Sequence, residues 1–193
     1  MIIRKLFKFE NAHIVRNCST QRCSKNIHGH SYKVEVLIES NYLDNGQMVY
    51  DFGLTKLYIK DIIDSFDHAI TLWSQDDPEY IKAMKIYSQR WITLPVSPSA
   101  EQFSRIFFLI IEKILSLSSF QNGEKEVKLQ SIIVHETDTG YAQCFKEDAH
   151  SKLMGLIDMN AIEFSSKVQN EWREKKLWEY ILQEKRLKIP KIV

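Results

Sequence analysis

Two segments of the chain alternate apolar and polar side chains with the period of two that is typical of β-strands. In residues 1–13 the positions that share one face are Ile3, Phe7, Phe9 and His13. In residues 28–39 they are His28, His30, Tyr32, Val34, Val36 and Ile38. Because successive side chains of a strand point to opposite faces, the pattern predicts two strands whose histidines lie on the apolar face.

The middle of the chain changes to helical spacing. In residues 54–66 apolar side chains recur every three or four positions, which predicts an amphipathic helix. A second helix is predicted to begin near Ser97, which can cap it, with Pro98 at the first helical position and Glu101 in the first turn. Before the first helix, an Asp-Asn-Gly turn should lead into a short strand that ends near Phe52.

Two more strands are predicted after the helices. Residues 127–138 and 140–148 should form a hairpin that turns at Thr139 and Gly140. The order is then strand, strand, helix, helix, strand, strand. This order indicates an α+β fold in which a four-stranded antiparallel sheet carries both helices on one face.

Two segments fall outside this core, which we expect to span residues 1–149. Residues 73–96 form an insertion between the two helices, and residues 150–193 form a C-terminal extension. Apolar residues in the extension recur at helical spacing and predict an amphipathic helix that docks on the core or on another subunit. These residues are Val168, Trp172, Trp178, Ile181 and Leu182.

Composition narrows the classes of function. The chain has 193 residues, 44% hydrophobic and 26% charged, which suits one folded domain with additions. A net charge of +1 gives no electrostatic signal for nucleic acid or an anionic membrane, so a small-molecule partner is expected. The N-terminus does not read as a signal peptide, and the longest apolar run, residues 106–111, is too short to cross a bilayer. We therefore expect a cytoplasmic protein whose three cysteines are free thiols or metal ligands.

Three histidines are the strongest chemical signal. A catalytic zinc ion takes three protein ligands and keeps one position open, and imidazole is its commonest nitrogen donor. The single residue between His28 and His30 lets one strand offer two donors, and His13 ends the other strand with the same inward parity. Three buried imidazoles without a metal would leave several polar nitrogens to satisfy, so a zinc site is favoured over core histidines.

A closed structural zinc site is the alternative. Cys18 and Cys23 could join His28 and His30 as a two-cysteine, two-histidine set. Structural sites usually separate their histidines by three to five residues, whereas here only one lies between them. In the open site, Cys23 would instead be a thiol near a divalent cation, which lowers a thiol pKa and makes a usable base.

Six short motifs occur in a recognisable order. They are "FENAH", a cysteine followed by "HGHSY", "GQMVYDF", "FDH", "SPSAEQ" before a helix, and "VHETDTG". Together they resemble the 6-pyruvoyl-tetrahydropterin synthase superfamily, and within it the bacterial 6-carboxy-5,6,7,8-tetrahydropterin synthases of queuosine biosynthesis. The resemblance covers residues 1–72 and 97–148.

The resemblance implies a role for individual residues. His13, His28 and His30 match the zinc ligands. Cys23 matches the catalytic cysteine, and Asp67 and His68 match the pair that completes a catalytic triad with it. Glu136 matches the glutamate that anchors the pterin ring, and Glu101 matches an acid at a helix start near the pterin pocket. Cys18, an additional thiol, could replace Cys23 as the base.

The resemblance also implies a fold, an assembly and a reaction. The fold is the tunnelling fold, whose subunits join edge to edge into trimeric barrels that stack as a hexamer, with the active site between subunits. The reaction converts 7,8-dihydroneopterin triphosphate to 6-carboxytetrahydropterin with loss of acetaldehyde and triphosphate. The spacing of four residues between Cys23 and His28 weakens the assignment to this branch. A 6-pyruvoyl-tetrahydropterin synthase, a non-catalytic zinc-stabilised module and a pterin-binding protein without turnover therefore remain alternatives.

Overall fold

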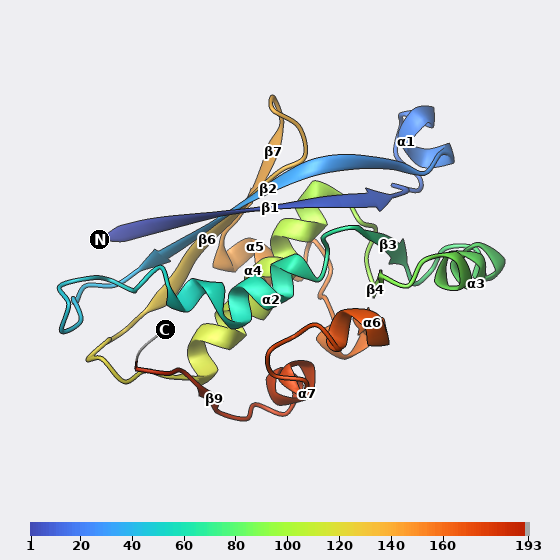
Figure 1. The fold of residues 1–193 in the computed structure, drawn as a ribbon. Coiled ribbons are helices and arrows are strands. Elements are labelled where there is room, and N and C mark those ends of the chain that lie inside the picture. Colours follow the sequence, from blue (N-terminus) through green and yellow to red (C-terminus); the bar gives the residue numbers. More distant parts are fainter. Residues whose placement is uncertain (192–193) are drawn as a thin grey trace.

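The central feature of the computed structural model, which describes residues 1–191, is an antiparallel sheet of four strands in the order β7-β6-β2-β1 (Figure 1). β1 (Ile2–His13) pairs with β2 (His28–Glu39) along its whole length, from Ile2 opposite Glu39 to His13 opposite His28. β6 (Lys128–His135) and β7 (Tyr141–Cys144) form the predicted hairpin. This part of the sheet agrees with the alternation in the sequence.

Two helices cover one face of these strands (Figure 1). α4 (Ala100–Leu117) is the longer one, and α2 (Tyr58–Asp64) follows a short 3-10 turn, η1 (Leu54–Lys56). The apolar positions of the strands and helices meet in one core, in which Phe9, Phe66, Phe103 and Phe107 contact one another. The core therefore lies directly beneath the end of β1 that carries His13.

The prediction of a four-stranded, purely antiparallel sheet was incomplete, because the sheet continues past β1 to seven strands. β3 (Ala69–Trp73) is parallel to β1 but pairs with it only at Asn11 and Ala12. β4 (Trp91–Leu94) is parallel to β3, and β8 (Glu163–Phe164) pairs with β4 in the antiparallel sense. In short apolar runs such as residues 69–73, periodicity cannot distinguish a buried strand from the end of a helix. These strands were therefore not predicted.

The segment between the helices is accordingly more than a surface insertion. Residues 73–96 contain α3 (Pro78–Tyr87) and the sheet strand β4. The side chain of Asp77 caps α3 by accepting hydrogen bonds from the backbone of Glu79 and Tyr80.

Two local predictions were wrong. Residues 47–52 form turns and bends, not a strand, because the Asp44 carboxylate accepts hydrogen bonds from the backbone of Gly46 and Met48 and holds a loop. The second helix is capped by Ser99, whose hydroxyl accepts from the Gln102 backbone, and not by Ser97.

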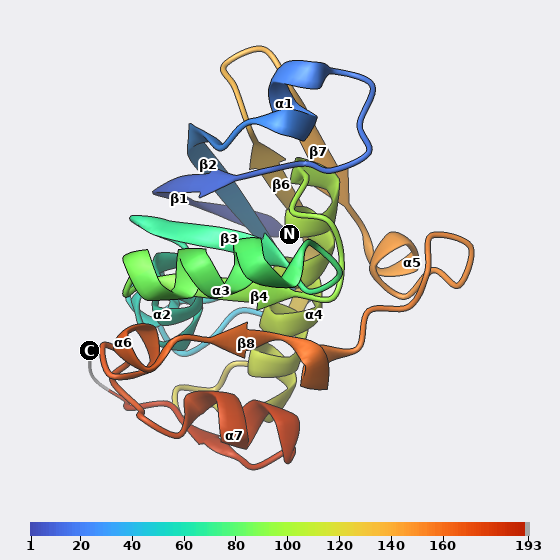
Figure 2. The ribbon, with the colours of Figure 1, turned by 90° about the vertical axis from the view of Figure 1, so that its right-hand side faces the viewer.

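The C-terminal extension is a series of short elements and not one amphipathic helix. Its helices are η2 (Met159–Ala161), α6 (Ser166–Gln169) and α7 (Leu177–Leu182), and the short helix α5 (Lys146–Ala149) ends just before it. Its strands are β8 and β9 (Leu187–Lys188), and β9 pairs with β5 (Ser118–Ser119). Figure 2 shows the extension running beneath β3 and β4. Trp172, Leu177 and Ile181 are buried, so the extension docks on the core of its own chain.

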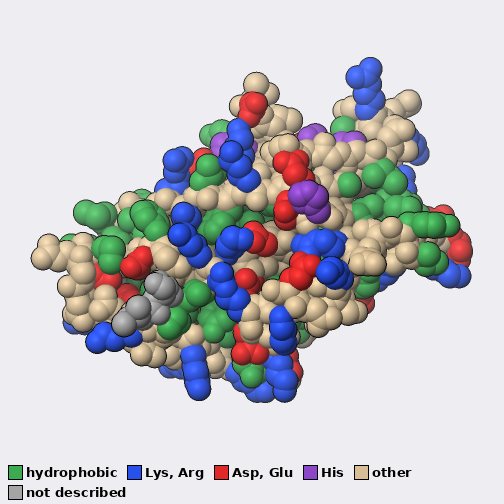
Figure 3. Space-filling view, in the orientation of Figure 1, with side chains coloured by type: hydrophobic (Ala, Val, Ile, Leu, Met, Phe, Trp, Pro, Cys, Tyr) green, Lys and Arg blue, Asp and Glu red, His purple; other side chains and the backbone are tan. Residues whose placement is uncertain are grey.

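The surface seen in Figure 3 intermixes basic and acidic side chains. Within residues 1–191, no helix combines the length and the apolar composition needed to cross a membrane.

Candidate active site

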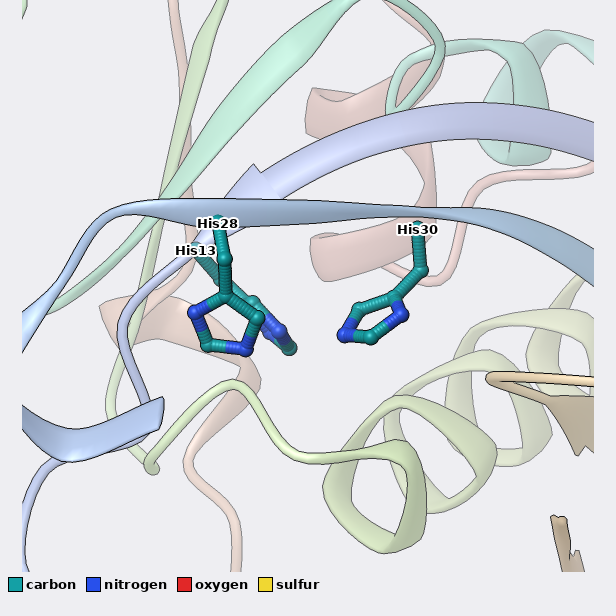
Figure 4. Close-up of side chains that lie close together, drawn as sticks. All are labelled: His13, His28 and His30. Atoms are coloured by element: carbon teal, nitrogen blue, oxygen red, sulfur yellow. The ribbon is translucent and has the colours of Figure 1, made fainter. Parts of the chain in front are cut away.

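The pairing of β1 with β2 brings three imidazoles together. His13 lies directly opposite His28, and His30 lies two residues further along the same face. One ring nitrogen of each histidine lies within 4.8 Å of those of the other two. Figure 4 shows the three rings converging below the two strands. The predicted histidine cluster is therefore formed, and it has the spacing that a single metal ion needs.

Burial and hydrogen bonding give His13 the protonation state that metal binding needs. Its Nδ1 lies 2.6 Å from the carbonyl oxygen of Pro98, and because a carbonyl only accepts, Nδ1 carries the proton and Nε2 carries none. Burial, reinforced by the neighbouring His28 and His30, lowers the pKa of His13 to about 4. Burial also lowers the pKa of His30. At neutral pH both rings are therefore in the uncharged form that binds metals.

Glycine at position 29 is required by the close approach of the two strands. A Cβ atom at Gly29 would lie 2.9 Å from the carbonyl oxygen of Asn11, which is closer than a real side chain allows. Any other residue would push β2 away from β1 and separate His13 from His28.

The donor set fits zinc in the open arrangement. Three neutral imidazoles are a known catalytic ligand set for this ion. Among residues 1–191, the cluster within reach of one ion comprises these three histidines, and neither Cys18 nor Cys23 belongs to it. The geometry thus favours the open site over the closed two-cysteine alternative.

Glu136 lies beside the histidines. Its Oε1 is 3.8 Å from Nε2 of His13 and 3.8 Å from Nε2 of His30. The buried Tyr32 hydroxyl donates a hydrogen bond of 3.2 Å to the same oxygen. Burial and the charge of Glu136 raise the pKa of Tyr32 far above its ordinary value, so it remains a donor. This contact was not predicted from the sequence, although Tyr32 has the same strand parity as His28 and His30.

A pocket of about 360 Å³ opens next to the cluster. Its lining includes Cys18, Cys23, His28, Glu101 and Glu136. These residues come from the loop after β1, from α1 (Gln21–Lys25), and from the ends of β2, β6 and α4. The fold thus gathers both carboxylates and both candidate thiols around one cavity.

The two thiols are neighbours within this pocket. Both cysteines line the pocket, and the Cys18 thiol donates a hydrogen bond to the carbonyl of Thr20 at 3.3 Å. Burial, followed by the proximity of Cys18 and Glu136, raises the pKa of Cys23. Without a cation nearby, Cys23 is therefore a neutral thiol at physiological pH.

Asp67 and His68 lie elsewhere in the chain, on the turn between α2 and β3. Nδ1 of His68 is 3.0 Å from Oδ2 of Asp67, and the His68 ring is 76% exposed. The two residues border a groove of about 670 Å³, and His68 also borders one of about 450 Å³; neither residue lines the pocket that contains Cys23. Within one chain, the predicted catalytic triad is not assembled.

β1 holds this turn from one side. The Asp67 carboxylate accepts from the Glu10 backbone at 2.8 Å, and the His68 backbone donates to the Glu10 carbonyl at 2.7 Å. The buried Asn11 side chain donates to the carbonyls of Phe66 and Ala69. His68 itself has a φ of 51°, a left-handed conformation that a non-glycine residue adopts only when its surroundings impose it.

A sheet that ends in a three-imidazole cluster beside an acid-lined pocket defines an α+β protein with a candidate metal centre. The chain belongs to the 6-pyruvoyl tetrahydropterin synthase family, whose model matches residues 2–147. A Helicobacter pylori protein named 6-carboxy-5,6,7,8-tetrahydropterin synthase is 40% identical over 187 residues, which span 96% of this chain and 94% of that protein.

Solved structures show the same fold. An uncharacterized protein from Wolinella succinogenes has a TM-score of 0.58 at 19% identity, with 76% of this chain and 98% of that chain covered. The 6-pyruvoyl tetrahydropterin synthase of Caenorhabditis elegans has a TM-score of 0.51 at 20% identity, with 75% and 94% covered. The chain is thus a member of a family of pterin synthases. Its C-terminal segment lies beyond residues 2–147, which the family model matches, whereas the Helicobacter pylori relative aligns with 96% of this chain.

Proposed function

We propose that this protein is a zinc-dependent 6-carboxy-5,6,7,8-tetrahydropterin synthase in the cytoplasmic route to queuosine. It would convert 7,8-dihydroneopterin triphosphate and water to 6-carboxytetrahydropterin, acetaldehyde and triphosphate. The observation that carries the proposal is the cluster of His13, His28 and His30 beside the pocket that contains Cys23 and Glu136. The name of the Helicobacter pylori relative supports this branch of the family.

His13, His28 and His30 would hold the zinc ion. When bound there, zinc supplies Lewis acidity to the side-chain oxygens of the substrate and makes neighbouring protons easier to remove. The hydrogen bond from His13 to Pro98 orients its ring and keeps the required tautomer.

Glu136 would anchor the pterin ring. The amino and ring N–H groups of a pterin form a two-pronged donor that one carboxylate accepts with two parallel hydrogen bonds. Tyr32 holds one oxygen of Glu136 in place, which limits the freedom the carboxylate must lose on binding. Glu101, at the start of α4, lines the same pocket and would be a second acceptor.

Cys23 would be the base that takes a proton from the substrate side chain. Burial and nearby negative charge keep it protonated in the metal-free pocket, so the cation would be needed to form the thiolate. Cys18 lines the same pocket and is the alternative base.

Asp67 and His68 would act in the pocket of a neighbouring subunit, His68 as a proton carrier oriented by Asp67. Their exposure on a separate groove supports this arrangement. The sheet edges also support assembly. β7 pairs on one side only, and β1 meets β3 only at Asn11 and Ala12, which leaves the edge of residues 2–10 open for edge-to-edge pairing. We propose a homohexamer made of two trimers.

The test is to incubate the zinc-loaded protein with 7,8-dihydroneopterin triphosphate and identify the products by mass. Acetaldehyde together with 6-carboxytetrahydropterin supports the proposal. Triphosphate release with all side-chain carbons retained would instead assign the 6-pyruvoyl reaction, which gives the family its name. Binding of the pterin without turnover would indicate a pterin-binding protein that is not an enzyme. Loss of zinc when Cys23 is replaced by alanine would indicate a structural zinc module.

A further inference from the structure

Two segments that the sequence analysis placed outside the core converge on one turn. The turn is residues 64–68, which carries Asp67 and His68. One segment is the stretch 73–96, which contributes Arg90 immediately before β4. The other is the C-terminal extension, which contributes Glu171 and Trp172.

Arg90 binds the backbone of the turn at three carbonyl groups. Its Nε donates to the carbonyl of Asp67 at 2.8 Å, and its Nη2 donates to those of Asp64 at 2.7 Å and Ser65 at 3.4 Å. Asp64 and Ser65 end α2, where backbone carbonyls lack helical partners. A guanidinium at a helix C-terminus satisfies such carbonyls and complements the helix dipole.

Glu171 holds the other end of the guanidinium. Its carboxylate accepts from Nη1 of Arg90, so the donors that do not bind the turn are directed toward the extension. The Arg90 side chain is 17% exposed and that of Glu171 is 45% exposed, so the guanidinium is shielded while its carboxylate partner faces solvent. An arginine fixed at both ends has one orientation available for its contacts with the turn.

Trp172 adds a second contact from the extension. Its buried indole donates a hydrogen bond of 2.8 Å to the Ser65 hydroxyl, which itself donates to the carbonyl of Asp61. Burial raises the pKa of Asp67, but the Glu10 N–H, His68 and the charge of Arg90 outweigh it and keep that pKa below its ordinary value. The carboxylate that orients His68 is therefore kept ionised.

We infer that Arg90, clamped by Glu171, is a positioning residue for the Asp67–His68 pair. This inference rests on the proposed role of that pair in the pterin reaction. Glu10 and Asn11 hold the turn from the β1 side, and Arg90 holds it from the other. The C-terminal extension, which lies beyond residues 2–147 of the family region, thus acts on catalysis without entering the pocket.

The chain offers a matched control. Residues 73–96 form a second ion pair with the extension, between Lys85 of α3 and Glu163, at 2.9 Å. Neither of these two residues contacts the 64–68 turn. Glu171→Gln and Glu163→Gln each break one ion pair between residues 73–96 and the extension, but only Glu171→Gln releases Arg90. Glu171→Gln also removes the exposed pair with Lys167 inside the extension. Arg90→Gln removes the contacts with the turn directly, and Arg90→Lys keeps the charge while losing the fork of donors.

We expect Arg90→Gln to lower kcat by about 10- to 100-fold and Glu171→Gln by about 3- to 10-fold, because small misplacements of catalytic groups have effects of this size. The two glutamate variants should have the same KM, zinc content and melting temperature. The kcat of Glu163→Gln should equal that of the unmodified protein. Arg90→Lys should recover part of the lost rate. The ¹H–¹⁵N spectrum of the His68 ring should change in Glu171→Gln and not in Glu163→Gln.

Equal kcat values and equal His68 spectra in the two glutamate variants would overturn the inference, as would a rise in KM at constant kcat. If Arg90→Gln fails to fold, the comparison of Glu171→Gln with Glu163→Gln still tests the inference. A protein without any pterin turnover refutes the proposed function, whereas the His68 spectra then still report whether the clamp orients the ring.

Discussion

The histidine cluster and the Asp67–His68 turn are held in different ways. The cluster depends on the register of two strands of 12 residues each, so many backbone hydrogen bonds place each ring. The turn is held by hydrogen bonds with the Glu10 backbone and by single side chains that reach it from three separate segments. A site on paired strands should therefore lose function when a ligand is removed, whereas a site on a turn should also respond to changes far from the chemistry.

The largest difference between the regions should appear in metal binding. His13→Ala removes one of the three proposed ligands and should weaken zinc binding by more than about 100-fold, since even loss of a ligand's hydrogen-bond partner costs about 10- to 100-fold. Turnover should be lost with the metal. His68→Ala should keep one zinc per chain while losing activity. Metal analysis of both purified variants tests this contrast. One zinc per chain in His13→Ala would contradict it.

The pocket thiols should separate chemistry from metal binding. Cys23→Ala should lower kcat by about 10²- to 10⁴-fold, the usual contribution of a positioned base, with zinc content unchanged. Cys18→Ala is the matched control and should change kcat by only a few fold. If the large loss instead follows Cys18→Ala, then Cys18 is the base.

Acid should destabilise the cluster region of the metal-free protein. The pKa of His13 is about 4 in the folded chain and 6.5 when unperturbed, so between these values the unfolded chain binds a proton that the folded chain does not. Stability should thus fall as the pH drops from 6.5 toward 4, by about 3 kcal/mol from this residue. Urea unfolding of chelator-treated protein at several pH values measures the loss. His13→Asn serves as the control, and an identical pH dependence in that variant would exclude His13 as the cause.

Pterin binding should depend on the carboxylate beside the cluster. Glu136→Gln should weaken binding of neopterin, which lacks the triphosphate, by about 10- to 100-fold, the range for hydrogen bonds to a charged group. Fluorescence titration measures the affinity, and zinc content should not change. Glu101→Gln should have the smaller effect, so a reversed order would move the pterin anchor to Glu101.

The smallest effect should come from the hydrogen bond between Trp172 and Ser65. Trp172→Phe keeps the buried ring volume but removes the hydrogen bond to Ser65, which should cost about 1 kcal/mol of unfolding free energy. Ser65→Ala should cost a similar amount, and the double variant should lose less than the sum. Strictly additive losses would show that the two side chains do not interact.

Much of the cluster could be predicted from residue parity alone. Alternation placed His13, His28 and His30 on the core-facing side of two strands, and the structure confirms that they converge. The same parity placed Tyr32 on the face of the histidines, but its position beside Glu136 depends on the register of β2 with β6. The three strands that extend the sheet were not predictable in this way. β3, β4 and β8 have five, four and two residues, and each pairs with a segment distant in the chain.

The sequence by itself determined which side chains share a face, because the direction of a side chain along a strand is a local property of the backbone. It also determined the ligand chemistry, since three imidazoles favour a divalent metal wherever they meet. Only the tertiary structure decided that Arg90 and Glu171, 81 positions apart, meet at the turn that carries His68. Such contacts depend on how distant segments pack, and no local pattern records that packing.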